Sequence, residues 1–90
     1  MKVVWTDTAH NLRTIHDYIA QNSPAYAKRM VDRLTARSKQ IGDFPLSRRV
    51  VPEFEVSQIR EVFQRPYRII YHIRPDHVAV IGVLHMSRRI

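Results

Sequence analysis

The residues with the clearest chemical potential in this sequence are four arginines and one histidine in its second half. Arginine presents a planar fork of N–H donors that matches phosphate oxygens, and histidine exchanges a proton near neutral pH. Such a set could cleave RNA by letting the 2′-oxygen attack its own phosphate, which needs a base, a phosphate clamp and an acid. It could equally form a docking patch, and for each residue alone a surface or structural role is the simpler interpretation. The set is Arg60, Arg68, His85, Arg88 and Arg89.

Other kinds of active site find no support in the sequence. The 90 residues include two glycines and no cysteine, which argues against a glycine-rich phosphate loop and excludes a cysteine-based zinc site. His10 and His16 are six residues apart on a predicted helix, so they do not share a face as an i, i+4 pair of metal ligands would. No local signature supports a Ser/His/Asp triad, and the RNA-recognition sheet motif is absent. We therefore expect neither a metal nor a cofactor.

Positive charge is concentrated in one part of the chain. The formal net charge is +7, and residues 28–49 carry seven cationic side chains against two acidic ones. Arg29, Arg33 and Arg37 step by four, so on a helix they line one exposed stripe. This stripe is either an ordinary solvated face or an electrostatic footprint for an anionic partner such as nucleic acid, a ribosome or an acidic protein.

The first half of the chain predicts two helices. Apolar residues recur at steps of three and four over residues 6–22, and either Thr6 or Asp7 can cap this helix. Ser23-Pro24 suits the start of a second helix, and Gly42 is its predicted left-handed C-cap. The short link between the helices predicts an antiparallel hairpin.

The remaining segments predict a sheet. Residues 2–5 form a short first strand, and the irregular segment 43–58 contains two prolines that forbid long regular elements. Three further strands follow at residues 59–63, 67–73 and 78–85. Their short links make neighbouring strands antiparallel. The order β-α-α-β-β-β predicts one α+β domain over residues 1–90, with a helical hairpin packed on a curled, mainly antiparallel sheet.

The segment YRIIYHI, residues 67–73, alternates between an apolar face and a second face. Its apolar face is predicted to belong to the core. The strand is predicted to pair across the Pro75-Asp76 turn with the strand at 78–85. Gly82 in that strand is expected to mark the close approach of another group. The predicted pairs are Ile73 with Val78, Tyr71 with Val80, Ile69 with Gly82 and Tyr67 with Leu84.

The second face should combine an aliphatic floor with a basic margin, which either binds a partner or is covered by the 43–58 loop. Its predicted members are Arg68, Ile70, His72, Ala79, Ile81, Val83 and His85. A three-residue turn after the strand at 59–63 would add Arg60 and Val62, whereas a two-residue turn would add Glu61 and Phe63.

The N-terminus shows no signal-peptide core, and no apolar run approaches the roughly 18 residues that span a membrane. Absence of cysteine fits a reducing compartment. We therefore expect a soluble, cytoplasmic protein that does not associate with a membrane.

Five segments of the sequence, taken in order, carry a resemblance to a known family. They are WTDTAHNLRTIHDYIA, SPxxA, RRVVPE, IREVFQRPYRIIYHI and VLHMSRR. Their ordered combination, which covers nearly all of the chain, resembles the RelE/ParE toxins of type II toxin–antitoxin modules. The resemblance implies a bacterial protein encoded beside an antitoxin, ParD-like or RelB-like, that wraps it with helical and extended segments.

The resemblance implies one of two activities. RelE-like members cleave mRNA on the ribosome with a basic cluster and often a C-terminal tyrosine, whereas ParE-like members poison DNA gyrase. The segment IREVFxxPYRIIY and the ending HxxRR are more similar to ParE, no lysine pair precedes Arg60, and no tyrosine follows Leu84. We expect a gyrase inhibitor, with the mRNA endonuclease as the alternative and a basic nucleic-acid-binding module as a third hypothesis.

The resemblance also suggests roles for individual residues. Contacts with the target are expected from Arg60, Arg68, His85, Arg88 and Arg89. In the nuclease alternative, Arg60, Arg68 and Arg88 would clamp phosphate, and His85 or Glu53 would act as base or acid. Contacts with the antitoxin are expected from Ile70, His72, Ile81, Val83, Arg29, Arg33 and Arg37.

Overall fold

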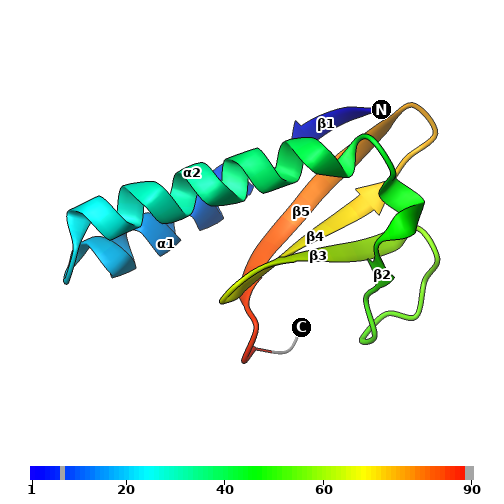
Figure 1. Ribbon diagram of the computed structural model, residues 1–90. Helices are drawn as coiled ribbons and strands as arrows, with labels where there is room; N and C mark the ends of the chain where they lie inside the picture. The colour runs from blue at the N-terminus through cyan, green and yellow to red at the C-terminus, as the bar shows by residue number, and fades with distance from the viewer. Residues whose placement is uncertain (7, 89–90) are drawn as a thin grey trace.

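The computed structural model describes residues 1–6 and 8–88, with residues 8–10 described by their backbone alone. Two helices lie against one face of a five-stranded sheet whose strand order is β1-β5-β4-β3-β2 (Figure 1). β1 pairs with β5 in parallel, and every other pair is antiparallel. The elements are β1 (Lys2–Trp5), α1 (Thr8–Ala20), α2 (Pro24–Ile41), the 3-10 helix η1 (Pro45–Ser47), β2 (Arg49–Val50), β3 (Ile59–Gln64), β4 (Tyr67–Ile73) and β5 (His77–His85).

The predicted α+β order is confirmed, with one addition. The two-residue strand β2 lies inside the segment that the prolines led us to expect as irregular, and it pairs with Arg60 and Glu61 of β3. No described helix is long and apolar enough to cross a membrane.

The predicted caps of the two helices are confirmed at one helix end and wrong at another. Ser23 caps α2 as expected, since its hydroxyl accepts a hydrogen bond from the Tyr26 N–H at 3.2 Å. At the start of α1, the Thr6 hydroxyl donates to the Val80 carbonyl at 2.8 Å, and Asp7 lies outside the described residues. Gly42 is not left-handed, because its φ of −63° and ψ of −21° are right-handed helical values.

Gly42 is needed for space instead of for a special backbone angle. The Met1 nitrogen donates to the Gly42 carbonyl at 2.7 Å, which brings the start of β1 directly against the end of α2. A Cβ atom at Gly42 would lie 2.2 Å from the Met1 carbonyl oxygen. At the second glycine, Gly82, a Cβ atom would have no neighbour within 4 Å, so our expectation of a close approach there was wrong.

The core lies between the helices and one face of the sheet. β4 contributes the predicted alternating set from Tyr67 to Tyr71, and Ile73 packs at its edge. Met30, Leu34 and Ile41 of α2 are fully buried against this face. The sheet residues in the core are Val62, Tyr67, Ile69, Tyr71, Val78, Val80 and Val83.

A β-bulge in the β4–β5 hairpin changes half of the predicted register. The predicted pairs Ile73–Val78 and Tyr71–Val80 are confirmed, but the register then shifts between Ile70 and Tyr71. From there Ile69 pairs with Val83 and Tyr67 with His85, so the expected partners Gly82 and Leu84 were wrong. An extra residue on one strand reverses the facing of every residue beyond it. The bulge therefore places Val83 and His85 on the helix side of the sheet.

The turn between β3 and β4 decides the alternative that the sequence left open. Gln64 pairs with Tyr67 and Phe63 with Arg68, which leaves a two-residue turn. Glu61 and Phe63 therefore share the face of Arg68, and Arg60 lies on the helix side. We call the face away from the helices the open face; its central residues are Glu61, Phe63, Arg68, Ile70, His72, Gly82 and Leu84.

The Gly42→Ala variant should lower the free energy of unfolding by about 1–3 kcal/mol, because the new methyl group must displace backbone at Met1. Gly82→Ala is the matched control: its methyl group has open space, and loss of glycine flexibility should raise stability by roughly 0.5 kcal/mol. Urea unfolding measures both. Equal effects of the two substitutions would contradict the packing of β1 against the end of α2.

Tyr71 links the core to η1, because its buried hydroxyl donates to the Pro45 carbonyl. Burial raises the pKa of the Tyr71 hydroxyl to about 12. A raised pKa in the folded state means that this group's contribution to stability is complete below its ordinary pKa of 10.0 and is lost as the pH rises toward about 12.

Above pH 10, the free energy of unfolding of the wild-type protein should therefore fall more steeply than that of Tyr71→Phe, by about 1 kcal/mol per pH unit. The variant lacks this extra loss because it has no hydroxyl to ionise. Urea unfolding at neutral pH and at about pH 11 measures the difference. Tyr18→Phe is the control, because that side chain is 70% exposed. Parallel losses in wild type and Tyr71→Phe would show that Tyr71 does not contribute.

Candidate binding site

The predicted set of arginines and histidine does not converge on one site. Arg68 lies on the open face, whereas Arg60 and His85 lie on the helix side of the sheet. Arg88 follows the end of β5, and Arg89 lies outside the described residues. The bulge and the two-residue turn together cause this separation, because each changes which face its strand presents.

Arg60 acts as a clamp on the segment that precedes β3. Its Nη1 donates to the carbonyls of Leu46 at 3.0 Å and Arg48 at 2.8 Å, and its Nε donates to the Ser57 carbonyl at 2.8 Å. The guanidinium thus ties both ends of the loop between η1 and β3 to the sheet. These contacts use Nη1 and Nε, which a phosphate clamp would need, while Nη2 reaches the Ser57 hydroxyl only at 3.5 Å.

Arg68 is the centre of a buried ion-pair network on the open face. It is 6% exposed, and its Nη1 donates to Glu53 Oε1 at 3.0 Å and to Glu61 Oε1 at 2.9 Å. Its Nη2 donates to Glu53 Oε2 and, at 3.0 Å, to the Arg88 carbonyl. Hydrogen bonding to Glu53 is the main cause that raises the pKa of Arg68 above its ordinary value. Arg49 approaches the other oxygen of Glu61 at 3.4 Å.

This network removes the positive charge that we expected on the open face. Two carboxylates, Glu53 and Glu61, surround the Arg68 guanidinium, and the hollow that they share with Arg49 and Phe63 has a volume of about 160 Å³. An anion that approached here would meet carboxylate oxygens beside the arginine. The arrangement is that of a structural ion pair in which both terminal nitrogens of Arg68 are bonded, whereas its buried Nε has no hydrogen-bond partner among the described residues.

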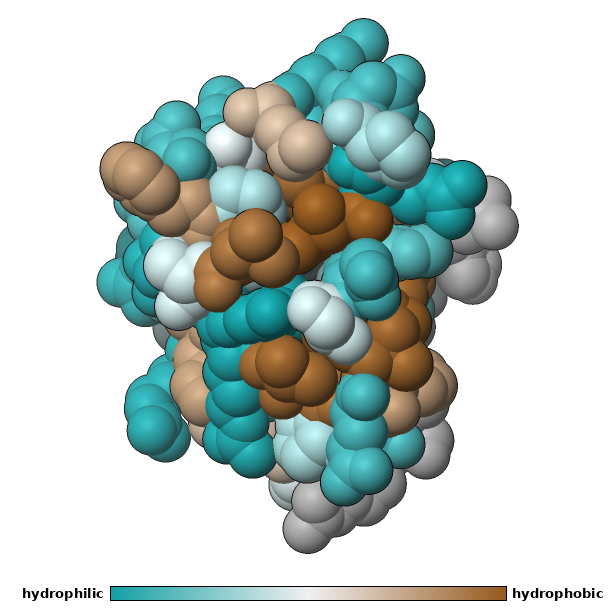
Figure 2. All heavy atoms as spheres, turned by 90° about the vertical axis from the view of Figure 1, so that its right-hand side faces the viewer, coloured by the Kyte–Doolittle hydropathy of each residue, from teal (hydrophilic) through white to brown (hydrophobic). Residues whose placement is uncertain are grey.

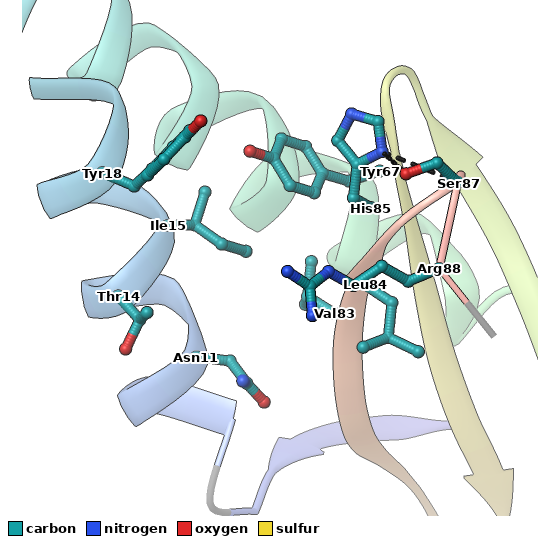
Figure 3. Close-up of a pocket in the computed structure, with 10 residues that line it drawn as sticks. All are labelled: Asn11, Thr14, Ile15, Tyr18, Tyr67, Val83, Leu84, His85, Ser87 and Arg88. Atoms are coloured by element: carbon teal, nitrogen blue, oxygen red, sulfur yellow. Dashed lines mark hydrogen bonds between the residues drawn. The ribbon is translucent and has the colours of Figure 1, made fainter. Parts of the chain in front are cut away.

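A larger groove of about 540 Å³ lies on the other side of the sheet, between α1 and the end of β5 (Figure 3). Ile15, Val83 and Leu84 provide its apolar surface. Leu84 belongs to the open face by its pairing with Arg68, but it lies in the part of β5 beyond the pairing with β1, at the edge of the sheet, where it also borders the groove. Tyr18 faces the groove from α1, and Arg88 extends its guanidinium into it from the C-terminal side. Its other residues are Asn11, Thr14, Tyr67, His85 and Ser87.

Aromatic and polar contacts shape the far wall of the groove. The rings of Tyr67 and His85 meet edge to face with centroids 5.5 Å apart. His85 Nδ1 and the Ser87 hydroxyl are hydrogen-bonded at 2.8 Å, as Figure 3 shows. Burial raises the pKa of the Tyr67 hydroxyl above its ordinary range. Arg88 forms no ion pair with any residue in the described part of the chain.

Sequence reasoning missed this groove. Asn11, Thr14 and Tyr18 recur at steps of three and four, which is the one signal in the sequence for a polar row on α1. That row gains meaning only when the fold places it opposite the end of β5. His85 and Arg88, which the sequence did single out, border the groove.

The residues that we expected to contact a partner lie in different environments. Ile70 is 3% exposed and Val83 2%, so the expected aliphatic floor is mostly buried, while Ile81 at the bulge is 42% exposed. His72 is half-buried. Val83 was wrongly placed on the open face, because the bulge turns it into the core.

The cationic stripe of α2 is largely confirmed as exposed surface. Arg29 and Arg33 are exposed, and Arg29 lies 5.9 Å from the ring centre of Tyr26. Arg37 is half-buried, because its Nε donates to the Phe63 carbonyl at 3.3 Å. The outer part of the stripe is therefore available to an anionic partner.

The loop between η1 and β3 covers part of the open face and also exposes apolar side chains of its own. Glu53 from this loop reaches Arg68. The large exposed apolar residues of residues 43–58 are Phe44, Leu46, Phe54 and Val56. Figure 2, which shows the side of the molecule on which η1 and β2 lie, has apolar surface gathered in the middle of the view with polar surface around it. Within the described residues no group of three metal-ligating side chains comes together.

Comparison with known proteins places this chain among toxins. A family model described as "ParE toxin of type II toxin-antitoxin system, parDE" matches residues 3–90. The toxin RelE2 of Caulobacter vibrioides is 34% identical over 89 residues, which cover 97% of each protein. A solved structure described as the chromosomal ParDE TA system from P. aeruginosa has the same fold, with a TM-score of 0.78 at 20% identity over 94% of this chain and 95% of that one.

The Arg68→Ala variant should lower the free energy of unfolding by about 3–5 kcal/mol, because it leaves Glu53 and Glu61 without their buried counter-charge. Arg49→Ala is the matched control: Arg49 also contacts Glu61, but its side chain is 59% exposed, so its removal should cost less than about 1 kcal/mol. Urea unfolding at neutral pH separates the two. A loss below about 1 kcal/mol for Arg68→Ala would show that the network is not a major source of stability.

Proposed function

This chain belongs to the ParE toxin family of type II toxin–antitoxin systems, and from that premise we propose that it inhibits DNA gyrase by docking and is neutralised by a cognate antitoxin. The fold and the family are common to gyrase inhibitors and to ribosome-dependent nucleases. The choice between these targets therefore depends on the arrangement of this chain's own side chains.

The observation that carries the proposal is the engagement of the two sheet arginines. Arg68 is enclosed by Glu53 and Glu61, and Arg60 donates to three backbone carbonyls. A nuclease of this kind needs guanidinium groups that are free to meet a phosphate and stabilise its developing charge. Because both groups already have protein partners, a docking toxin without a catalytic site of its own fits the geometry better.

A ribosome-dependent mRNA endonuclease is the second candidate, and the groove beside α1 favours it. His85 and Arg88 both border that groove, next to the Tyr67 hydroxyl. A histidine can transfer a proton and an arginine can bind phosphate there. In this alternative Arg60 and Arg68 support the fold, and the chemistry depends on His85 and Arg88 alone.

The groove also supports the proposed antitoxin partner. It offers apolar surface at Ile15 and Leu84 beside the guanidinium of Arg88. A segment that combines apolar side chains with a carboxylate matches both features, and the net charge of +7 favours an acidic partner. Arg29 and Arg33 on α2 and Ile81 on the sheet are exposed as well, and they are further candidates for contact with the antitoxin.

A gyrase supercoiling assay with the purified chain tests the proposal. We expect inhibition of supercoiling, and relief of that inhibition when the antitoxin encoded beside the gene is added. A ribosomal mRNA cleavage assay runs in parallel with wild type and His85→Ala. If supercoiling is unaffected while mRNA is cut, and His85→Ala lowers the cleavage rate by about two to four decades, the nuclease candidate replaces the gyrase inhibitor.

A third outcome separates the basic nucleic-acid-binding module from both toxin activities. Such a module would bind DNA or RNA by itself, with an affinity that falls steeply as salt concentration rises. Salt-dependent binding without inhibition of gyrase or translation would overturn the proposal in favour of that module.

A further inference from the structure

The short segment after β5 connects the two sides of the sheet. The Met86 N–H donates to the Pro66 carbonyl at 2.8 Å, and the Arg88 N–H donates to the His85 carbonyl at 2.9 Å. Arg88 then borders both hollows, the large groove beside α1 and the small one around Arg68. Its carbonyl is held on one side while its guanidinium extends to the other (Figure 3).

Arg68 is the group that holds the Arg88 carbonyl, and its own orientation is set by two carboxylates. Glu53 accepts from both terminal nitrogens of Arg68, and Glu61 accepts from Nη1. One hydrogen of Nη2 is bonded to Glu53, so the orientation of the guanidinium fixes the direction of the second. That second hydrogen is donated to the Arg88 carbonyl, 3.0 Å from Nη2. The rigid fork of arginine makes this possible, and lysine could not reproduce it.

We propose that Arg68, held between Glu53 and Glu61, is a positioning residue that fixes Arg88 over the groove, where the Arg88 guanidinium binds a carboxylate of the antitoxin. The carboxylate site rests on the proposed antitoxin partner, whereas the positioning of Arg88 is a property of the chain by itself. The buried charges on the open face would thus serve an interaction on the opposite side of the sheet.

The surroundings of Arg88 explain why a carboxylate is the expected ligand. The guanidinium lies next to Val83 and Leu84 and across from Ile15, which makes the groove a partly apolar environment. Charge-assisted hydrogen bonds are stronger where water is excluded, and arginine binds carboxylates with two parallel donors. An acidic side chain flanked by apolar ones would fill the groove and pair with Arg88 together.

The first test uses the chain without a partner. In Glu53→Gln, the hydrogen exchange of the Arg88 amide should accelerate by about tenfold, and nuclear Overhauser contacts between the Arg88 side chain and the Leu84 methyl groups should weaken. Glu55→Gln is the matched control, because it makes the same chemical change two residues away on an exposed side chain. Unchanged exchange and contacts in Glu53→Gln would overturn the positioning role.

The second test is a double-mutant cycle on the affinity for the purified, full-length antitoxin. Arg88→Ala should weaken binding about tenfold to a hundredfold, and Glu53→Gln should weaken it about fivefold. If Glu53 acts through Arg88, adding Glu53→Gln to Arg88→Ala should cause no further loss. An equal loss in both backgrounds would show that the network supports another contact and would overturn the proposed route through Arg88.

Two outcomes separate this inference from the proposed function. If Glu53→Gln frees Arg88 but Arg88→Ala leaves antitoxin affinity unchanged, the carboxylate site is overturned and the positioning alone is retained. If the wild-type chain does not bind the antitoxin, the proposed partner is wrong, and the exchange measurement still decides the positioning. Should Glu53→Gln fail to fold, Arg68→Lys keeps the buried charge but removes the fork, and the same expectations apply.

Discussion

The buried charge of Arg68 is the constraint on which the open side of the sheet depends. A guanidinium removed from water requires compensating carboxylates and hydrogen-bond acceptors, or the fold loses several kcal/mol. Glu61 supplies one carboxylate from the neighbouring strand, and Glu53 supplies the other from the loop between η1 and β3. Because Glu53 has to reach Arg68, this loop is drawn over the open face. The Arg88 carbonyl accepts a further hydrogen bond from Arg68 and so holds the segment after β5 at the same point.

Several arginines of this strongly basic chain are used for contacts inside the fold. Arg60 and Arg68 hold the loop and the sheet together, and Arg37 binds a strand carbonyl. Other cations remain on the surface, among them Arg29 and Arg33 of α2, Arg49 of β2 and Arg88 beside the groove. Charge of this kind, spread over exposed positions, steers and binds an acidic partner more readily than it stabilises one reacting phosphate.

The β-bulge at Ile81 determines which residues can act together. Before the bulge, β5 follows a simple alternation; after it, Val83 faces the helices and His85 stands beside Tyr67. This one shift takes His85 away from Arg68 and brings it to the groove. It also leaves the apolar side chain of Ile81 exposed, although Val80 and Val83 of the same strand are buried. The expected set of arginines and histidine is therefore divided between the two faces of the sheet in part because of one local change in the backbone of β5.

The sequence by itself determined the fold class, the order of the long elements and the family. Hydrophobic periodicity predicts the helices and strands, because the period of a helix or a strand is a property of consecutive residues. The Ser23 cap and the first two pairs of the β4–β5 hairpin were equally local and equally predictable. Only the tertiary structure decided the bulge, the length of the turn before β4, the role of Gly42 and the burial of Arg68. The last two depend on atoms that are distant in sequence: Glu53 lies 15 residues from Arg68, and Met1 lies 41 residues from Gly42. The charge of a side chain can be read from the sequence, but whether that charge is free or already paired depends on packing.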